Sequence, residues 1–111
     1  MVEFEFQDHP RHEVVSLTGE VDLYCVGDLK KELIQHIDQN RERIKSLVID
    51  MTALKYMDSS GIALMANLQK KLKAIGAKMY LVSVNSDIMN VLRLSALDSF
   101  FSIHENVDAA P

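Results

Sequence analysis

Residues 46–65 read SLVIDMTALKYMDSSGIALM, and this segment is the most informative about the fold. It opens with a short apolar run, Ser46 to Met51, whose β-branched centre is typical of a strand covered on both faces in a parallel sheet. We expect a loop from Thr52 to Asp58 and then a long helix. The apolar positions of that helix fall within an arc of about 100°. They are Leu64, Met65, Leu68, Leu72 and Ile75. The helix is therefore expected to pack one face on the sheet.

The alternation of strand and helix continues toward the C-terminus. Gly76 is expected to cap the long helix, and the apolar run 79–84 predicts another buried strand. Ser86 is a suitable N-cap for a third helix through residues 88–94. Residues 100–104 are expected to form a last edge strand.

The N-terminal third predicts a hairpin and a first helix. Phe4 and Phe6 alternate with polar residues, residues 9–12 supply a turn, and a second strand follows until Gly19 breaks it. Apolar residues then recur at helical spacing up to about Arg41. The whole chain, residues 1–111, is therefore expected to be one domain: an α/β sandwich with a mixed, mostly parallel sheet opened by an N-terminal hairpin and helices packed against it.

Composition excludes several function classes. The chain has 111 residues, of which 48% are hydrophobic and 25% charged, and this composition is typical of one globular domain. A net charge of −4 without a basic cluster argues against nucleic-acid binding. The N-terminus lacks the pattern of a signal peptide, Cys25 has no disulfide partner, and no apolar run approaches the roughly 20 residues of a membrane span. We therefore expect a cytoplasmic protein without direct membrane insertion.

The segment Asp58-Ser59-Ser60-Gly61 is the candidate functional site. Alone it is an ordinary helix N-cap, because Asp and Ser side chains accept hydrogen bonds from the free N–H groups of a first helical turn. Two features favour a function. The segment follows a parallel strand, at the sheet edge where α/β proteins place ligand and partner sites. A similar acidic turn, Gly19-Glu20-Val21-Asp22, precedes the first helix and is expected on the same surface.

These residues resemble the STAS domain of bacterial anti-sigma-factor antagonists and of sulphate-transporter tails. The resemblance covers nearly the whole chain and is strongest in Leu17-Thr18-Gly19-Glu20-Val21-Asp22 and in Tyr56-Met57-Asp58-Ser59-Ser60-Gly61-Ile62. Leu29, Leu47 to Asp50, Gly76 and the region from Leu92 to Leu97 also fit. One departure is Cys25, which stands where the family usually has a Ser, Thr or Asn cap.

The resemblance implies a partner-switching cycle. An anti-sigma factor that is also a GHKL-type serine kinase would bind the unphosphorylated chain, free its sigma factor, and be released once Ser59 is phosphorylated. A PP2C-type phosphatase would restore the serine. The residues implied at the partner surface are Glu20, Asp22, Asp58, Ser59, Ser60 and Gly61. The ATP belongs to the kinase, so the chain is expected to need no cofactor, to have no catalytic residue, and to be a monomer when free.

Three other interpretations compete with this one. A STAS-like scaffold subunit would use the same surface for docking without phosphorylation. An enzyme with Ser59 or Ser60 as nucleophile lacks a visible base and a Gly-x-Ser-x-Gly elbow. Metal binding is disfavoured because the four histidines, which we expect at the surface, are scattered along the sequence: His9, His12, His36 and His104.

Overall fold

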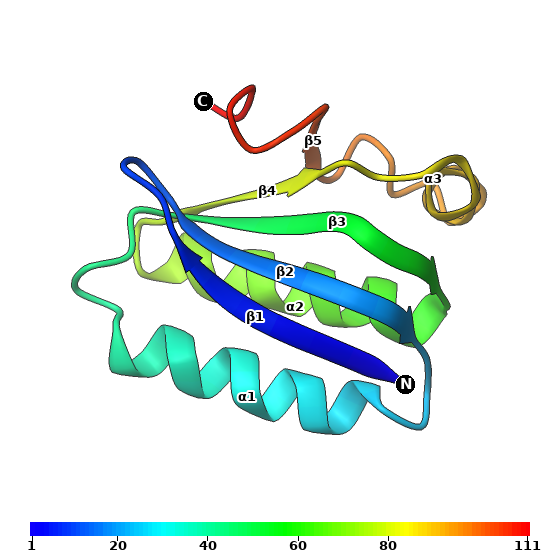
Figure 1. Ribbon diagram of the computed structural model, residues 1–111, viewed down its shortest axis with the longest axis horizontal. Coiled ribbons are helices and arrows are strands. Elements are labelled where there is room, and N and C mark those ends of the chain that lie inside the picture. Colours follow the sequence, from blue (N-terminus) through cyan, green and yellow to red (C-terminus); the bar gives the residue numbers. More distant parts are fainter.

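The five strands of the sheet keep the order of the chain. The computed structural model describes residues 1–111, and its sheet runs β1-β2-β3-β4-β5 (Figure 1). The elements are β1 (Val2–Asp8), β2 (Glu13–Val21), α1 (Val26–Gln39), β3 (Ser46–Met57), α2 (Ser59–Ala74), β4 (Lys78–Val82), α3 (Ser86–Leu94) and β5 (Ser102–His104). None of the three helices combines the length and the apolar character needed to cross a membrane.

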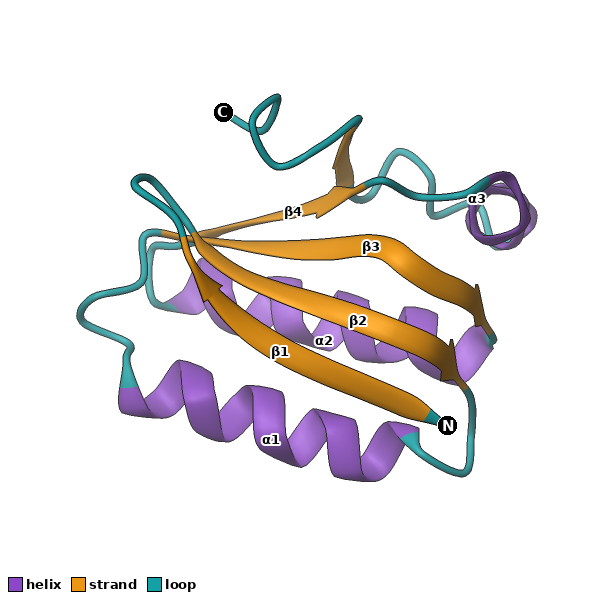
Figure 2. Cartoon of the chain, viewed as in Figure 1, coloured by secondary structure: helices purple, strands orange, loops and turns teal.

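The sheet is mixed, as predicted. β1 pairs antiparallel with β2, from Val2 opposite Gly19 to Asp8 opposite Glu13, and all other neighbours are parallel. Parallel neighbours need crossover connections, and α1 and α2 provide the first two of them. Both helices lie side by side on one face of the sheet (Figure 2), where the Lys71 ammonium is 2.8 Å from the Asp38 carboxylate.

The core lies mainly between the sheet and these two helices. Twenty-three buried residues form it, including Leu17 of β2, Leu33 of α1 and Leu68 of α2. A second, smaller cluster occupies the opposite face of the sheet, where the C-terminal segment covers it. Its members are Val14, Val48, Tyr80, Val82 and Ala110. Because both faces are covered, Leu47, Val48 and Ile49 are all at most 1% exposed, which confirms that this run is a doubly buried strand.

The predicted loop from Thr52 to Asp58 is wrong, because β3 continues to Met57. The prediction that Gly19 breaks the second strand is also wrong. β2 extends to Val21 and pairs with β3 across two register shifts, one of them directly after Gly19. Gly19 has φ of +100°, and a Cβ on it would come within 2.4 Å of the Met1 carbonyl oxygen. The glycine therefore bends the strand at a bulge without ending it.

Two helix caps differ by one residue from the predictions. Asn85 is the N-cap of α3 in place of Ser86, and its side chain accepts a hydrogen bond from Ile88 N at 2.9 Å. Asn85 also donates to the Leu54 carbonyl at 3.0 Å, a tertiary contact that no local pattern reveals. At the end of α2, Ile75 is the C-cap and Gly76 follows it with φ of +78°. This left-handed glycine one residue beyond the cap is a common helix stop.

Other predicted boundaries were close. α1 ends at Gln39, two residues before the predicted end, and β4 ends at Val82, two residues early. The last edge strand exists but is shorter than expected, because β5 covers only Ser102–His104.

Candidate functional site

Asp58 joins the end of β3 to the start of α2. Its backbone is extended (φ −85°, ψ −174°), and its carboxylate accepts from Ser60 N at 2.9 Å and from Gly61 N at 3.3 Å. The Ser60 hydroxyl donates to the same oxygen. Asp58 is therefore the N-cap of α2, as the sequence predicted.

The two serines after Asp58 have different surroundings. Ser60 is half-buried and its hydroxyl is held by Asp58. Ser59 is exposed at the first position of α2. The Ser59 hydroxyl is therefore the more accessible nucleophile of the pair, next to a helix N-terminus whose partial positive charge favours anionic groups.

Asp58 stays ionised over the neutral pH range. The hydrogen bond from the Ser60 hydroxyl lowers the pKa of Asp58, and the backbone N–H groups of Gly61, Ser60 and Leu23 lower it further against a smaller opposing effect of burial. A fixed negative charge therefore lies beside Ser59. A negative charge added to Ser59 would therefore be repelled by this neighbouring carboxylate.

The second acidic turn lies directly against the first, as predicted. The Asp58 amide donates to the Val21 carbonyl at 3.1 Å, and the Leu23 amide donates to Asp58 Oδ2 at 3.2 Å. The turn itself is closed by Asp22, whose Oδ1 accepts from Tyr24 N at 3.0 Å and from Cys25 N at 3.1 Å. The carboxyl ends of β2 and β3 therefore form one continuous surface.

Glu20 and Cys25 complete the turn. Glu20 is exposed and pairs with Tyr56 across the β2–β3 ladder. Cys25 is the N-cap of α1 but makes no side-chain capping bond, and its thiol lies 3.5 Å from the Glu20 carbonyl oxygen. The Asp22 side chain holds the amides of Tyr24 and Cys25 just before the helix, so the departure at Cys25 leaves the turn closed.

Gly61, which the resemblance implies at the partner surface, has a packing role. It is buried, and a Cβ on it would lie 2.2 Å from Met57 Cγ and 3.0 Å from Val21 Cγ1. Only a glycine lets the first turn of α2 approach the ends of β2 and β3 this closely. The glycine thus lets α2 begin close to the ends of β2 and β3, which determines where Ser59 lies.

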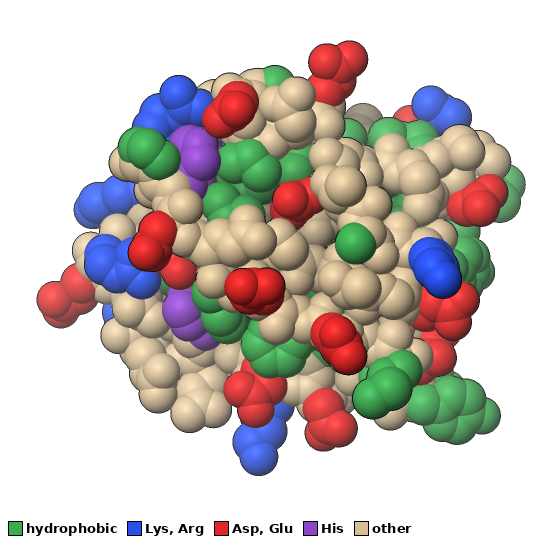
Figure 3. All heavy atoms as spheres, in the orientation of Figure 1, with side chains coloured by type: hydrophobic (Ala, Val, Ile, Leu, Met, Phe, Trp, Pro, Cys, Tyr) green, Lys and Arg blue, Asp and Glu red, His purple; other side chains and the backbone are tan.

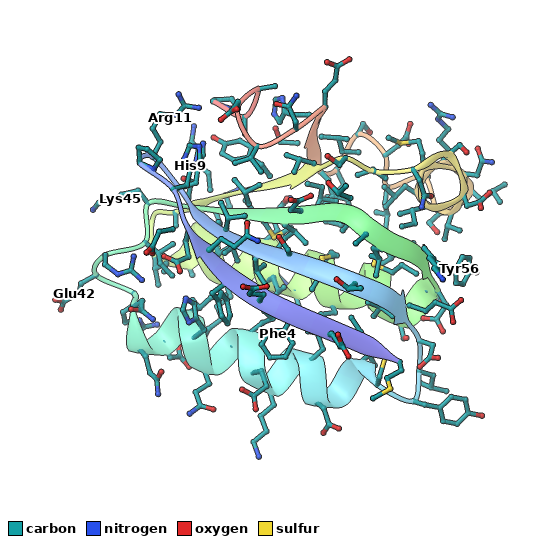
Figure 4. All side chains as sticks on the ribbon, viewed as in Figure 1. Phe4, His9, Arg11, Glu42, Lys45 and Tyr56 are labelled. Atoms are coloured by element: carbon teal, nitrogen blue, oxygen red, sulfur yellow. The ribbon has the colours of Figure 1, made fainter.

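Sequence reasoning missed the exposed apolar side chains beside this surface. Leu23 is 70% exposed, Tyr24 is 94% exposed and Tyr56 is 42% exposed. Figure 4 shows Tyr56 at this end of the sheet, opposite the end that carries His9 and Arg11. The available signal was local: Leu23 and Tyr24 lie between the acidic turn and the first periodic apolar residue of α1, so neither belongs to the helix core.

The prediction that all four histidines lie at the surface is wrong for His12. Its side chain is buried under the C-terminal segment, with Nδ1 in hydrogen-bond distance of Ser46 Oγ at 2.5 Å. Burial lowers the pKa of His12. The rings of His9 and Tyr80 lie 5.2 and 5.9 Å from that of His12. This group is at the hairpin end, away from Ser59, so it supplies no base for a serine nucleophile.

Comparison with known proteins gives the chain a family. The family model described as "STAS domain" matches residues 3–110. Among curated relatives, an anti-sigma F factor antagonist of Paenibacillus polymyxa is 25% identical over 105 residues, which cover 95% of this chain and 88% of the relative.

Solved structures with the same fold include two anti-sigma factor antagonists. An anti-sigma factor antagonist from Mycobacterium paratuberculosis matches with a TM-score of 0.85 at 23% identity, covering 97% of this chain and 89% of that one. Unphosphorylated SpoIIAA matches with a TM-score of 0.79 at 22% identity, covering 96% and 92%. The phosphorylated form of SpoIIAA matches with a TM-score of 0.71 at 22% identity, covering 96% of each chain. These structures confirm the predicted fold.

Proposed function

The chain belongs to the STAS domain family, and on that premise we propose that it acts as an anti-sigma factor antagonist controlled by phosphorylation of Ser59. The observation that carries the proposal is the contrast between the two serines: Ser59 is exposed at the helix start, and Ser60 is tied to Asp58. The names of the relatives support the antagonist role, and the existence of a phosphorylated form of SpoIIAA supports a phosphorylation switch.

The chemistry of the switch is a phosphoryl transfer to the Ser59 oxygen. A GHKL-type kinase, which is also the anti-sigma factor, transfers the γ-phosphoryl group of ATP to Ser59 Oγ, and ADP and the hydroxyl proton leave. A PP2C-type phosphatase later hydrolyses the phosphate ester to free serine and inorganic phosphate. The chain is a substrate in both steps, and its fold places the serine at the exposed start of α2.

Phosphorylation changes the surface more than the fold. It adds about −1.5 to −2 charges and three acceptor oxygens at Ser59. The N-terminus of α2 favours such an anion by about 0.3–1 kcal/mol, so the domain should stay folded. A partner pressed onto this surface would have to bury the new charge beside the Asp58 carboxylate, which is costly. Binding should therefore weaken.

The proposal is tested by phosphorylation of matched variants. The wild type, Ser59→Ala and Ser60→Ala are incubated with ATP and a purified GHKL-type kinase of the source organism, and intact mass is measured. We expect one added phosphate on the wild type and on Ser60→Ala, and none on Ser59→Ala. Phosphate on Ser59→Ala would refute the site. Binding of the kinase without phosphorylation of any variant would favour the scaffold role.

A further inference from the structure

The turn of residues 22–25, called here the anchor turn, presents two apolar side chains to solvent. Leu23 and Tyr24 are 70% and 94% exposed, and both belong to the small set of large hydrophobic residues left outside the core. Figure 3 shows hydrophobic side chains projecting beyond the surface near the connection between β2 and α1, with acidic side chains close by. Large apolar side chains grouped at one exposed place are a common mark of an interaction site.

The anchor turn is held rigidly, so the exposure of these side chains is built into the fold. Asp22 accepts from two amides of the turn, and the amides of Cys25 and Val26 donate to the Asp22 carbonyl at 3.2 and 2.9 Å. The Leu23 amide is held by Asp58 at 3.2 Å. A turn fixed in advance loses little conformational entropy when a partner binds it.

The chain segment that carries the anchor turn is acidic. Glu20, Asp22, Asp28 and Asp58 lie in or beside it, and no lysine or arginine occurs from Thr18 to Leu29. A partner that covers Leu23 and Tyr24 must therefore offer an apolar pocket bordered by basic side chains.

We propose that Leu23 and Tyr24 are the main binding residues for the anti-sigma factor kinase, inserting into an apolar pocket bordered by lysine or arginine. This inference rests on the proposed function and names the contact that gives it affinity. Tyrosine in a desolvated pocket is among the most frequent sources of binding energy at interfaces. Ser59 then acts as the regulated position, and the anchor turn supplies the attraction that phosphorylation opposes.

The Asp58 carboxylate also connects the anchor turn with the Ser59 position. One oxygen of Asp58 caps α2 next to Ser59, and the other holds the Leu23 amide. A phosphate on Ser59 would repel this carboxylate and compete for the same helix N–H groups. The anchor turn should therefore loosen when Ser59 is phosphorylated, so that the switch acts on the apolar contact as well as on charge.

The binding role is tested with the double variant Leu23→Ser/Tyr24→Ser. The matched control is Phe100→Ala, which removes a 49% exposed aromatic ring near the other end of α2, beside Gly76. With the purified kinase and a non-hydrolysable ATP analogue, calorimetry should give a Kd at least about tenfold higher for the double variant than for wild type. The control should stay within about threefold.

The outcomes separate this inference from the proposed function. If the double variant binds as tightly as the wild type, the anchor role is wrong, whether or not Ser59 accepts phosphate in the mass assay. If Ser59 accepts no phosphate, the proposed function fails independently. A change in self-association of the double variant, measured by light scattering, with unchanged kinase binding would also overturn the inference.

The connection through Asp58 is tested without any partner by Asp58→Asn. An amide side chain has one acceptor oxygen, so it can cap α2 or hold the Leu23 amide, but not both. Because Asn is a good N-cap, the helix should remain intact. Hydrogen exchange at the Leu23 amide should be at least about tenfold faster than in wild type. An unchanged exchange rate would refute the connection.

Discussion

The two ends of the sheet use polar side chains in opposite ways. At the hairpin end, polar groups satisfy one another: Glu13 accepts from Arg43 at 2.7 Å and lies 2.9 Å from His36 Nε2, and His12 lies against Ser46. At the other end, the Asp58 carboxylate accepts hydrogen bonds from backbone amides. The side chains of Ser59, Leu23 and Tyr24 at this end are exposed to solvent. This difference indicates that the polar groups of the hairpin end stabilise the fold, and it supports the proposal that the Ser59 end serves binding.

The carboxylates of the two ends differ in the cause of their low pKa values. Burial of Glu13 works to raise its pKa, but hydrogen bonds from Arg43 and His36 outweigh this effect and lower it. At Asp58 the Ser60 hydroxyl is the main cause of the lowered pKa, with backbone amides adding to it. Glu13 therefore depends on tertiary ion pairs, and Asp58 depends on the local geometry of a helix start.

The largest loss of stability is expected from a substitution at Gly61, where the Ser59 end of the sheet is most tightly packed. Gly61→Ala places a Cβ 2.2 Å from Met57 Cγ and should lower the free energy of unfolding by about 1–3 kcal/mol. Gly27→Ala in α1 is the control, because the new methyl group would meet nothing within 4 Å, and it should stabilise by about 0.4–1 kcal/mol. Urea unfolding measures both. Equal effects of the two substitutions would contradict the packing role of Gly61.

The next effect tests the paired charges of the hairpin end. Glu13→Gln weakens its contacts with Arg43 and His36, and it should lower the free energy of unfolding by about 1.5 kcal/mol at neutral pH. Binding to the kinase should be unchanged, since this end is distant from Ser59. A loss of binding without a loss of stability would reverse the roles assigned to the two ends.

A pH-dependent effect is expected from His12. Its pKa is lowered in the fold by burial, so between its unfolded value near 6.5 and its folded value the unfolded chain binds more protons. Stability should therefore be complete above pH 6.5 and decrease as the pH falls. Between pH 7.5 and 5.5, the free energy of unfolding measured in urea should fall less in His12→Gln than in wild type. The difference between the two proteins should be at most about 1.4 kcal/mol. An identical decrease in both proteins would show that His12 titrates normally.

The smallest effects distinguish the two serines. Ser60→Ala removes a hydrogen bond to Asp58 and should cost about 0.5–1 kcal/mol in thermal unfolding. Ser59→Ala should change stability by less than about 0.5 kcal/mol, because Ser59 is exposed. A larger loss for Ser59→Ala than for Ser60→Ala would mean that Ser59 is a structural residue.

The sequence predicted the features that depend on local patterns. The apolar run from Leu47 to Ile49, the N-cap Asp58 and the acidic turn at Asp22 follow from periodicity and capping chemistry, and the structure confirms their places. Features set by tertiary contacts were missed. β3 extends past Thr52 because β2 pairs with it, and His12 is buried because the C-terminal segment covers it. The exposure of Leu23 and Tyr24 was also missed, although its signal is local: both lie between the acidic turn and the first periodic apolar residue of α1.

We propose that a phosphate on Ser59 weakens partner binding without unfolding the domain. The direct measurement is the Kd of the purified GHKL-type kinase, with a non-hydrolysable ATP analogue, for the unphosphorylated and the Ser59-phosphorylated chain, with circular dichroism of both forms. We predict a Kd at least about tenfold higher for the phosphorylated form and unchanged spectra. Equal affinities of two folded forms would show that the charge on Ser59 does not control partner binding.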